Sequence, residues 1–161
     1  MLIGILSDTH DKLGRTISAI QLLQAEGVEA IFHCGDLTGP EIVHACGVLP
    51  LTFVFGNNEY DLTSLRRAAR DANSLCLEYG GDVVLGGKRI ALTHGHLDRE
   101  WRRLEASEPD YLFYGHSHIA ADDRRGGIRR INPGALHRAE QFTVAVLDLA
   151  ADRLRFIPVP R

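Results

Sequence analysis

The sequence predicts an α/β domain in which two β-sheets pack together and helices cover their outer faces. Three successive units of strand, polar loop and helix occupy the first half of the chain, residues 2–72. Units of this kind place neighbouring strands parallel in one sheet, with the helices packed on its face. The second half contains short strands joined by glycine turns, which indicates hairpins and a second sheet.

Apolar runs and turn residues place the elements of the first half. Strands are expected at 2–6, 30–34 and 51–55, because each is a short apolar run that stops at a polar loop. The first helix has apolar residues at helical spacing and ends near Gly27. The second helix opens at Pro40, and the third covers 62–72.

The second half is organised by turns. Strands are expected at 83–85 and 89–93 around Gly86-Gly87, and at 111–114. A helix should cover 98–106, and two more hairpins should turn at Gly126-Gly127 and at 150–152. No linker or repeat interrupts the pattern, so we expect one domain over residues 1–161.

The composition limits the function classes. The 161 residues are 45% hydrophobic and 24% charged, which is typical of a soluble globular domain. A net charge of -3 gives no overall attraction to nucleic acid or to an anionic membrane. The three cysteines form no CxxC pair, the first residues lack the features of a signal peptide, and no apolar run would span a bilayer. We therefore expect a cytoplasmic protein.

Residues able to bind a metal follow the ends of several expected strands. They are Asp8, His10, Asp36, Asn57, His94, His116 and His118. Ligands of α/β sheets collect beyond the carboxyl ends of the strands, and this mixture of oxygen and nitrogen donors suits a divalent first-row metal. Alternation along an extended chain would aim Asp8 and His10 to one side and Thr9 to the other. Each residue alone fits a turn, cap or surface position equally well, but the set predicts a metal site.

Five short motifs follow one another in a fixed order. They are D-T-H at 8–10, G-D at 35–36, G-N-N-E at 56–59, H-G-H at 94–96 and G-H-S-H at 115–118. With N-P-G at 132–134, they resemble the calcineurin-like metallophosphoesterase superfamily, and in particular its small single-domain bacterial and archaeal branch. The resemblance covers nearly the whole chain. It implies a four-layer α-β-β-α sandwich of two packed mixed sheets flanked by helices.

The resemblance also implies roles for the motif residues. One divalent metal ion would be held by Asp8, His10, Asp36 and His118, and a second by Asp36, Asn57, His94 and His116. Asp36 would bridge the ions, and a hydroxide shared between them would attack the phosphorus of a small phosphoester substrate. Manganese is the preferred metal, with nickel, iron, cobalt or zinc as alternatives.

One position departs from the family pattern. The strongest phosphomonoesterases of the superfamily have a histidine after the motif asparagine, where it assists the leaving group. This chain has Asn58, whose amide donates a hydrogen bond but delivers no proton at neutral pH. We therefore predict that phosphodiesters and activated esters are hydrolysed more readily than phosphomonoesters.

The remaining polar residues receive more local interpretations. His96 is a candidate to contact the substrate phosphate, whereas His33 is expected to pack beside the site. His44 and His137 are assigned to the surface. Glu59 either holds a metal ligand in place or caps the following helix. The arginines at 99–103 and 124–130 are taken as solvated faces.

A function of another class competes with the enzyme. Some members of this fold are protein-binding scaffolds that have lost metal-ligating histidines. All seven ligand positions are filled here, which favours the enzyme over a scaffold with a vestigial site. A nuclease would need a long basic groove or an accessory domain, so no obligatory nucleic acid and no membrane partner are expected. The sequence leaves association into a homo-oligomer open.

Overall fold

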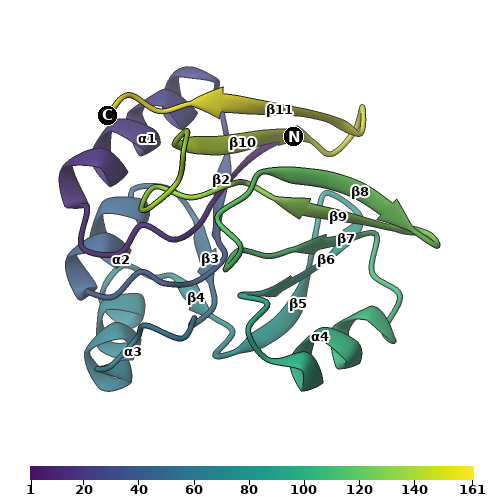
Figure 1. The fold of residues 1–161 in the computed structure, drawn as a ribbon, viewed down its shortest axis with the longest axis horizontal. Helices are drawn as coiled ribbons and strands as arrows, with labels where there is room; N and C mark the ends of the chain where they lie inside the picture. The colour runs from purple at the N-terminus through teal and green to yellow at the C-terminus, as the bar shows by residue number, and fades with distance from the viewer.

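Two β-sheets packed face to face form the centre of the molecule in the computed structural model, which describes residues 1–161 (Figure 1). The strands are β1 (Leu2–Leu6), β2 (Ala30–His33), β3 (Leu51–Phe53), β4 (Leu75–Cys76), β5 (Gly80–Leu85), β6 (Lys88–Thr93), β7 (Tyr111–Phe113), β8 (Ala121–Arg125), β9 (Ile128–Asn132), β10 (Thr143–Asp148) and β11 (Arg153–Pro158). The helices are α1 (Leu13–Ala25), α2 (Pro40–Cys46), α3 (Leu62–Asp71) and α4 (Asp98–Glu105). None of them combines the length and apolarity that crossing a bilayer would require.

The first sheet has six strands in the order β11-β10-β1-β2-β3-β4. Strands β1 to β4 run parallel, because each connection through α1, α2 or α3 crosses the sheet and returns the chain in the same direction. Strand β10 pairs antiparallel with β1, and β11 pairs antiparallel with β10. The carboxyl ends of β1, β2 and β3 therefore lie next to one another at one edge.

The second sheet has five strands in the order β5-β6-β7-β9-β8. Its inner strands β6, β7 and β9 are parallel, and antiparallel hairpins add β5 and β8 as the two edges. Both hairpins turn at the expected glycine pairs, where Gly86, Gly87 and Gly126 have positive φ. Both sheets are thus mixed.

Three apolar clusters define the layers. A cluster of 14 buried residues, including Phe32 and Phe113, fills the space between the sheets. A larger cluster of 21 buried residues joins the outer face of the first sheet to α1, α2 and α3. A small cluster around Leu104 joins α4 to the outer face of the second sheet. Figure 1 shows the resulting order of helices, sheet, sheet and helix.

The predicted fold class, a four-layer sandwich of two mixed sheets, is confirmed. The differences lie at the ends of strands: β2, β3 and β7 stop one or two residues earlier than their apolar runs do, and β5 begins at Gly80 rather than at the expected Val83. Val54 and Phe55, past the end of β3, are still buried, and their N–H groups bond to the carbonyls of His33 and Glu78 outside the regular strand pairing. The two-residue strand β4 was not predicted, since it is too short to show a periodic pattern.

Candidate metal centre

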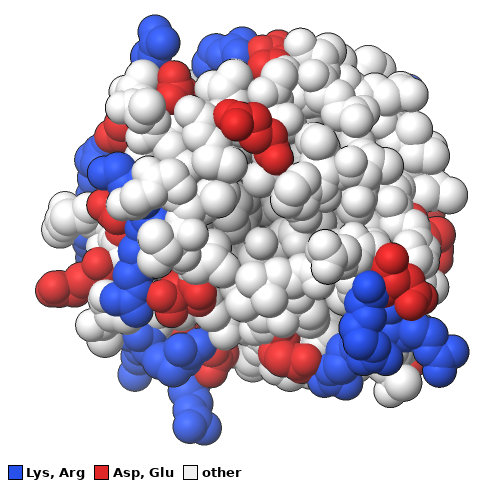
Figure 2. Space-filling model, turned by 180° about the vertical axis from the view of Figure 1, so that it is seen from behind, with Lys and Arg blue, Asp and Glu red and all other residues white.

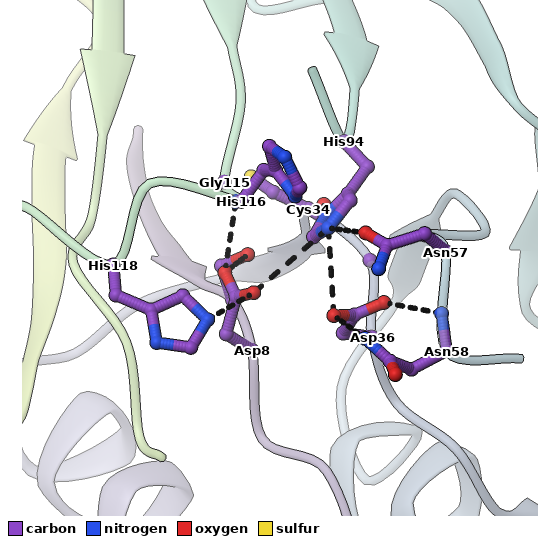
Figure 3. A network of polar contacts seen from close by, with 12 residues as sticks. Asp8, Cys34, Asp36, Asn57, Asn58, His94, Gly115, His116 and His118 are labelled. Atoms are coloured by element: carbon purple, nitrogen blue, oxygen red, sulfur yellow. Dashed lines mark hydrogen bonds and ion pairs between the residues drawn. The ribbon is translucent and has the colours of Figure 1, made fainter. Parts of the chain in front are cut away.

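The residues expected to bind metal gather where the two sheets meet at the carboxyl ends of their strands. The loops after β1, β2 and β3 provide Asp8, His10, Asp36 and Asn57. The loops after β6 and β7 provide His94, His116 and His118. Figure 3 shows that the two carboxylates lie at the centre of this group, with His118 beside Asp8 and with Asn57 and Asn58 near Asp36.

Asp8 belongs to two groups of side chains whose ligand atoms lie within 4.8 Å of one another. The first group is Asp8, His10 and His118, and the second is Asp8, Asp36 and His94. The Oδ2 atom of Asp36 connects the groups, since it lies 3.5 Å from Nε2 of His10 and 3.5 Å from Nε2 of His94. The two adjacent groups, which have Asp8 in common, could each hold a metal ion.

Two of the rings beside the carboxylates, His94 and His118, are oriented by main-chain carbonyls. The Nδ1 atom of His94 lies 2.8 Å from the carbonyl oxygen of Cys34, and Nδ1 of His118 lies 3.3 Å from that of Arg138. Because a carbonyl only accepts, each Nδ1 carries the proton, and a neutral ring then has its lone pair on Nε2. In neutral rings these lone pairs face other acceptors: Nε2 of His94 is 3.1 Å from Oδ1 of Asn57, and Nε2 of His118 is 3.1 Å from Oδ1 of Asp8. Burial alone would lower the pKa of His94, but in the metal-free protein the carboxylates of Asp36 and Asp8 outweigh burial and raise it, so a cation at this place would take over the role of the ring proton.

Two more buried atoms of the centre have no hydrogen-bond partner. They are Oδ1 of Asp8 and Nε2 of His10. An unpaired buried polar atom costs about 1–3 kcal/mol of folding free energy. The arrangement of these two atoms is therefore unfavourable without a further binding partner. A divalent cation among these atoms would satisfy all of them, and carbonyl-oriented imidazoles are the usual surroundings of metal-binding histidines. The residues present therefore fit divalent metal ions.

Left-handed backbone, rather than strand alternation, aims these side chains. Strand β1 ends at Leu6, and both Asp8 and His10 have positive φ, 52° and 48°. Asp36, His116 and His118 also have positive φ. Such conformations are uncommon outside glycine and concentrate at functional sites. The expected common orientation of Asp8 and His10 is present, but the reason given for it was wrong.

The glycines of the motifs make room for the carboxylates. A Cβ atom on Gly56 would lie 2.1 Å from Oδ1 of Asp36, and one on Gly115 would lie 2.0 Å from Oγ of Ser7 and 2.7 Å from Oδ2 of Asp8. Ser7 in turn donates a 2.6 Å hydrogen bond to Oδ2 of Asp8. One oxygen of Asp8 is thus held by the protein, which leaves Oδ1 free to bind an ion. Nothing in the sequence pattern had indicated that Ser7 takes part.

The side chain of Asn58 binds Asp36. Its Nδ2 atom donates to Oδ2 of Asp36 at 2.7 Å, and its backbone N–H donates to Oδ1 at 2.9 Å. Burial alone would raise the pKa of Asp36, but the interactions with His94 and Asn58 outweigh burial and hold this pKa well below its usual range. Asp36 is therefore ionised over the whole physiological pH range.

Glu59 joins two loops of the centre instead of capping a helix. Its carboxylate accepts hydrogen bonds from the backbone N–H groups of Leu37 and Gly56. Helix α3 is capped by Asp61, which accepts from the N–H of Ser64. The structure thus shows that Glu59 holds candidate metal ligands in place, because it joins the loops that carry Asp36 and Asn57, and that it does not cap the helix.

His33 packs beside the centre and belongs to neither ligand group, as expected. It is fully buried, with Nε2 3.0 Å from Oγ1 of Thr9 and with Nδ1 accepting from the N–H of Gly35. Burial, together with the nearby His94, lowers the pKa of His33 to about 3. The ring is therefore neutral in the folded protein at pH values well above 3.

The buried neutral state of His33 predicts a loss of stability in acid. Below pH 6.5 the unfolded chain takes up a proton on this ring and the folded chain does not, so the free energy of unfolding falls as the pH falls toward 3. In His33→Gln, which keeps a donor and an acceptor, this contribution is absent. The stability advantage of the wild type over His33→Gln should shrink by about 1.5 kcal/mol between pH 6.5 and pH 5, measured by urea unfolding of metal-free protein. An advantage that stays constant with pH would show that His33 titrates normally.

Of the remaining histidines, His96 and His137 lie beside the candidate centre, and His44 lies away from it on α2. His96 lies 5.3 Å from the ring of His94, between centroids, and its Nδ1 is buried without a partner. His137 was assigned to the surface, but its ring packs against His10 with a centroid distance of 4.3 Å. His44 is exposed on α2, as expected.

The arginine clusters are mostly ion-paired. Arg129 is buried and binds Asp122 and Asp152, which corrects its assignment to a solvated face, and Arg130 binds Asp123. Figure 2 shows the side opposite to Figure 1, where lysines and arginines lie near the margins next to acidic residues and the central area carries few charges. This face does not present the continuous basic surface that a nucleic-acid backbone requires.

Comparisons with known proteins agree with this geometry. Residues 1–152 match the model of the calcineurin-like phosphoesterase superfamily domain. A phosphodiesterase of Methanocaldococcus jannaschii is 29% identical over 138 residues, which cover 83% of this chain and 83% of that protein. A phosphodiesterase of Escherichia coli is 27% identical over 146 residues, which cover 84% of this chain and 79% of that protein. The solved structure of an archaeal phosphodiesterase superposes with a TM-score of 0.90 at 27% identity, covering 99% of this chain and all of that one.

Proposed function

The chain belongs to the calcineurin-like phosphoesterase superfamily and is a metal-dependent phosphoesterase, and we propose that it hydrolyses phosphodiesters with two divalent cations between its sheets. The observation that carries this proposal is the convergence of imidazole lone pairs on carboxylate and amide oxygens. A structural network of the same residues would pair donors with acceptors. When His94 and His118 are neutral, their Nε2 lone pairs face the oxygens of Asn57 and Asp8, as lone pairs do around a cation.

The ligands divide between two adjacent ions. Asp8, His10, Asp36 and His118 would hold one, and Asp36, Asn57, His94 and His116 the other. The position of Asp36 Oδ2 midway between His10 and His94 supports its role as the bridge. Asp8 also lies within reach of both groups, which had not been expected from the motifs. Manganese is the preferred metal, because the set mixes hard carboxylates with imidazoles.

The chain's own groups prepare the site for this chemistry. Two bound cations would supply an activated hydroxide and would neutralise charge on the phosphoryl oxygens. The carbonyls of Cys34 and Arg138 fix the orientation of His94 and His118, and Asn58 fixes that of Asp36. His96, whose Nδ1 has no partner, is positioned to donate to a phosphate oxygen.

Phosphodiesters are the favoured substrates because position 58 offers no proton. A general acid accelerates such reactions by roughly 10²–10⁴-fold, and esters with poor leaving groups depend on it most. In addition, the amide of Asn58 is already engaged with Asp36. Small diesters with good leaving groups should therefore react faster than alkyl monoesters.

A protein-binding scaffold of the same fold is the alternative. It would require no cation, and its polar residues would be free to satisfy one another. The unpaired Oδ1 of Asp8 and Nε2 of His10 argue for the enzyme, since a vestigial site gains nothing from keeping them. We also propose that residues 1–161 act as one domain and that the protein is cytoplasmic, which its three free cysteines favour.

Removal and return of metal tests the proposed function. Protein stripped with a chelator and desalted should not hydrolyse bis(4-nitrophenyl) phosphate, and added Mn²⁺ should restore turnover. An Asp11→Asn variant is a suitable control, because Asp11 is exposed in the loop that carries Asp8 and His10 but belongs to neither ligand group. Turnover that survives chelation, or that Mn²⁺ and the other candidate metals do not restore, would contradict the proposal.

A further inference from the structure

A groove opens beside the candidate metal centre. It has a volume of about 710 Å³ and is lined by His118, Ile119, Ala120, Glu140, Gln141 and Thr143. His118 is a wall of both the groove and the centre, because its Nε2 lies 3.1 Å from Oδ1 of Asp8. His118 is thus the one candidate ligand that the groove and the centre have in common, and the groove is the space next to the centre on this side.

The walls of the groove are tied to the rest of the fold. Thr143 donates a 2.7 Å hydrogen bond to the carbonyl of Pro133, and a Cβ on Gly134 would lie 2.1 Å from its hydroxyl oxygen. Arg161 binds the main-chain carbonyl of Glu140 and lies over the ring of Phe142. These bonds hold one wall of the groove, at Thr143 and at the main chain of Glu140, in place.

The chemistry of the lining selects what binds there. Ile119 is 69% exposed and gives the lining an apolar wall. Thr143 already uses its hydroxyl, and none of the six lining residues is Lys or Arg. The one formal charge of the lining is the carboxylate of Glu140. A ligand with an apolar face and no negative charge is the best match.

We propose that this groove binds the ester substituent that the phosphate retains, and that it prefers uncharged groups with an apolar face over anionic ones. The inference rests on the proposed phosphodiesterase function and adds a substrate class to it. Asn58, the residue at the leaving-group position, and His118 lie on opposite sides of the two carboxylates (Figure 3). A diester whose leaving group is near Asn58 therefore directs its other substituent toward His118 and the groove. Diesters whose retained substituent carries a second negative charge, such as a further phosphate, should be poor substrates.

Two diesters with the same leaving group test this inference. The neutral diester is 4-nitrophenyl phenyl phosphate and the anionic one is 4-nitrophenyl 4-carboxyphenyl phosphate, with Mn²⁺-loaded protein and kcat/KM as the readout. The wild type should prefer the neutral diester, and Glu140→Lys should reduce that preference roughly fivefold. Glu108→Lys is the matched control, because Glu108 is exposed away from the groove and undergoes the same charge change. It should leave the preference unchanged.

The apolar wall is tested by a second variant. Ile119→Ser should weaken the binding of the neutral phenyl diester and raise its KM roughly threefold. The corresponding methyl diester should keep its wild-type KM, since a methyl group does not reach the wall. Equal preferences in Glu140→Lys, Glu108→Lys and the wild type would overturn the groove assignment while diester hydrolysis itself stands. Failure of the Mn²⁺-loaded wild type to hydrolyse any of these diesters would overturn the proposed function and this inference with it.

Discussion

Replacing Asp36 with asparagine is expected to loosen both metal ions and to reduce diester hydrolysis by on the order of a hundredfold or more. Asp36 is the one carboxylate assigned to both ions, and its Oδ2 lies equally far from His10 and His94. The amide keeps the shape of the carboxylate but removes the negative charge that offsets two divalent cations. The measurements are metal content after desalting and kcat/KM with bis(4-nitrophenyl) phosphate as substrate.

Asp11→Asn provides the control, because it is the same chemical change in an exposed residue of a neighbouring loop. It should keep the metal content and the activity of the wild type. If Asp36→Asn retained both metals and full turnover, the assignment of Asp36 as the bridge would be wrong. Circular dichroism of the variant separates loss of metal from loss of the fold.

Replacing Asn58 with histidine is expected to raise phosphomonoester hydrolysis relative to aryl-diester hydrolysis, by tenfold or more if the ring acts as a general acid worth roughly 10²–10⁴-fold. An imidazole with an ordinary pKa of about 6.5 donates a proton near neutral pH, whereas the amide of Asn58 does not. An aryl leaving group departs without that proton, so the hydrolysis of an aryl diester should be accelerated little by the added imidazole. The measurement is kcat/KM for an alkyl monoester and an aryl diester at matched metal occupancy.

Asn58→Ala separates the two effects of this substitution. It removes the hydrogen bond to Asp36 without adding an imidazole, so it should lower both activities and leave their ratio unchanged. A ratio in Asn58→His equal to that of the wild type would remove the reason for preferring diesters.

The fold was largely predictable because apolar patterns determine it. Runs such as 2–6 and 30–34 form parallel strands in the middle of the first sheet that are buried on both faces, and that burial requires a continuous apolar sequence. The point at which a strand ends depends on its partners, which apolar patterns do not record. β3 ends at Phe53, although the apolar run continues to Phe55, because its pairing with β2 ends at His33 and its partner β4 has only two residues.

The centre was predictable in its membership but not in its orientation. Asp8, Asp36 and His94 belong to motifs whose residue types reveal their chemistry. The rings of His94 and His118 are oriented by the main-chain carbonyls of Cys34 and Arg138, and any residue type provides a carbonyl. The contact of Asn58 with Asp36 and that of His137 with His10 join segments far apart in the chain. Only the tertiary structure brings such pairs together.

Metal stoichiometry tests the central claim most directly. Protein loaded with Mn²⁺ and then desalted should contain close to two equivalents of metal per chain by elemental analysis, because two adjacent ligand groups share their carboxylates. The same measurement on Asp11→Asn should give the same value. A reproducible content near zero, in protein that is folded by circular dichroism, would contradict the dinuclear centre and the enzyme built on it.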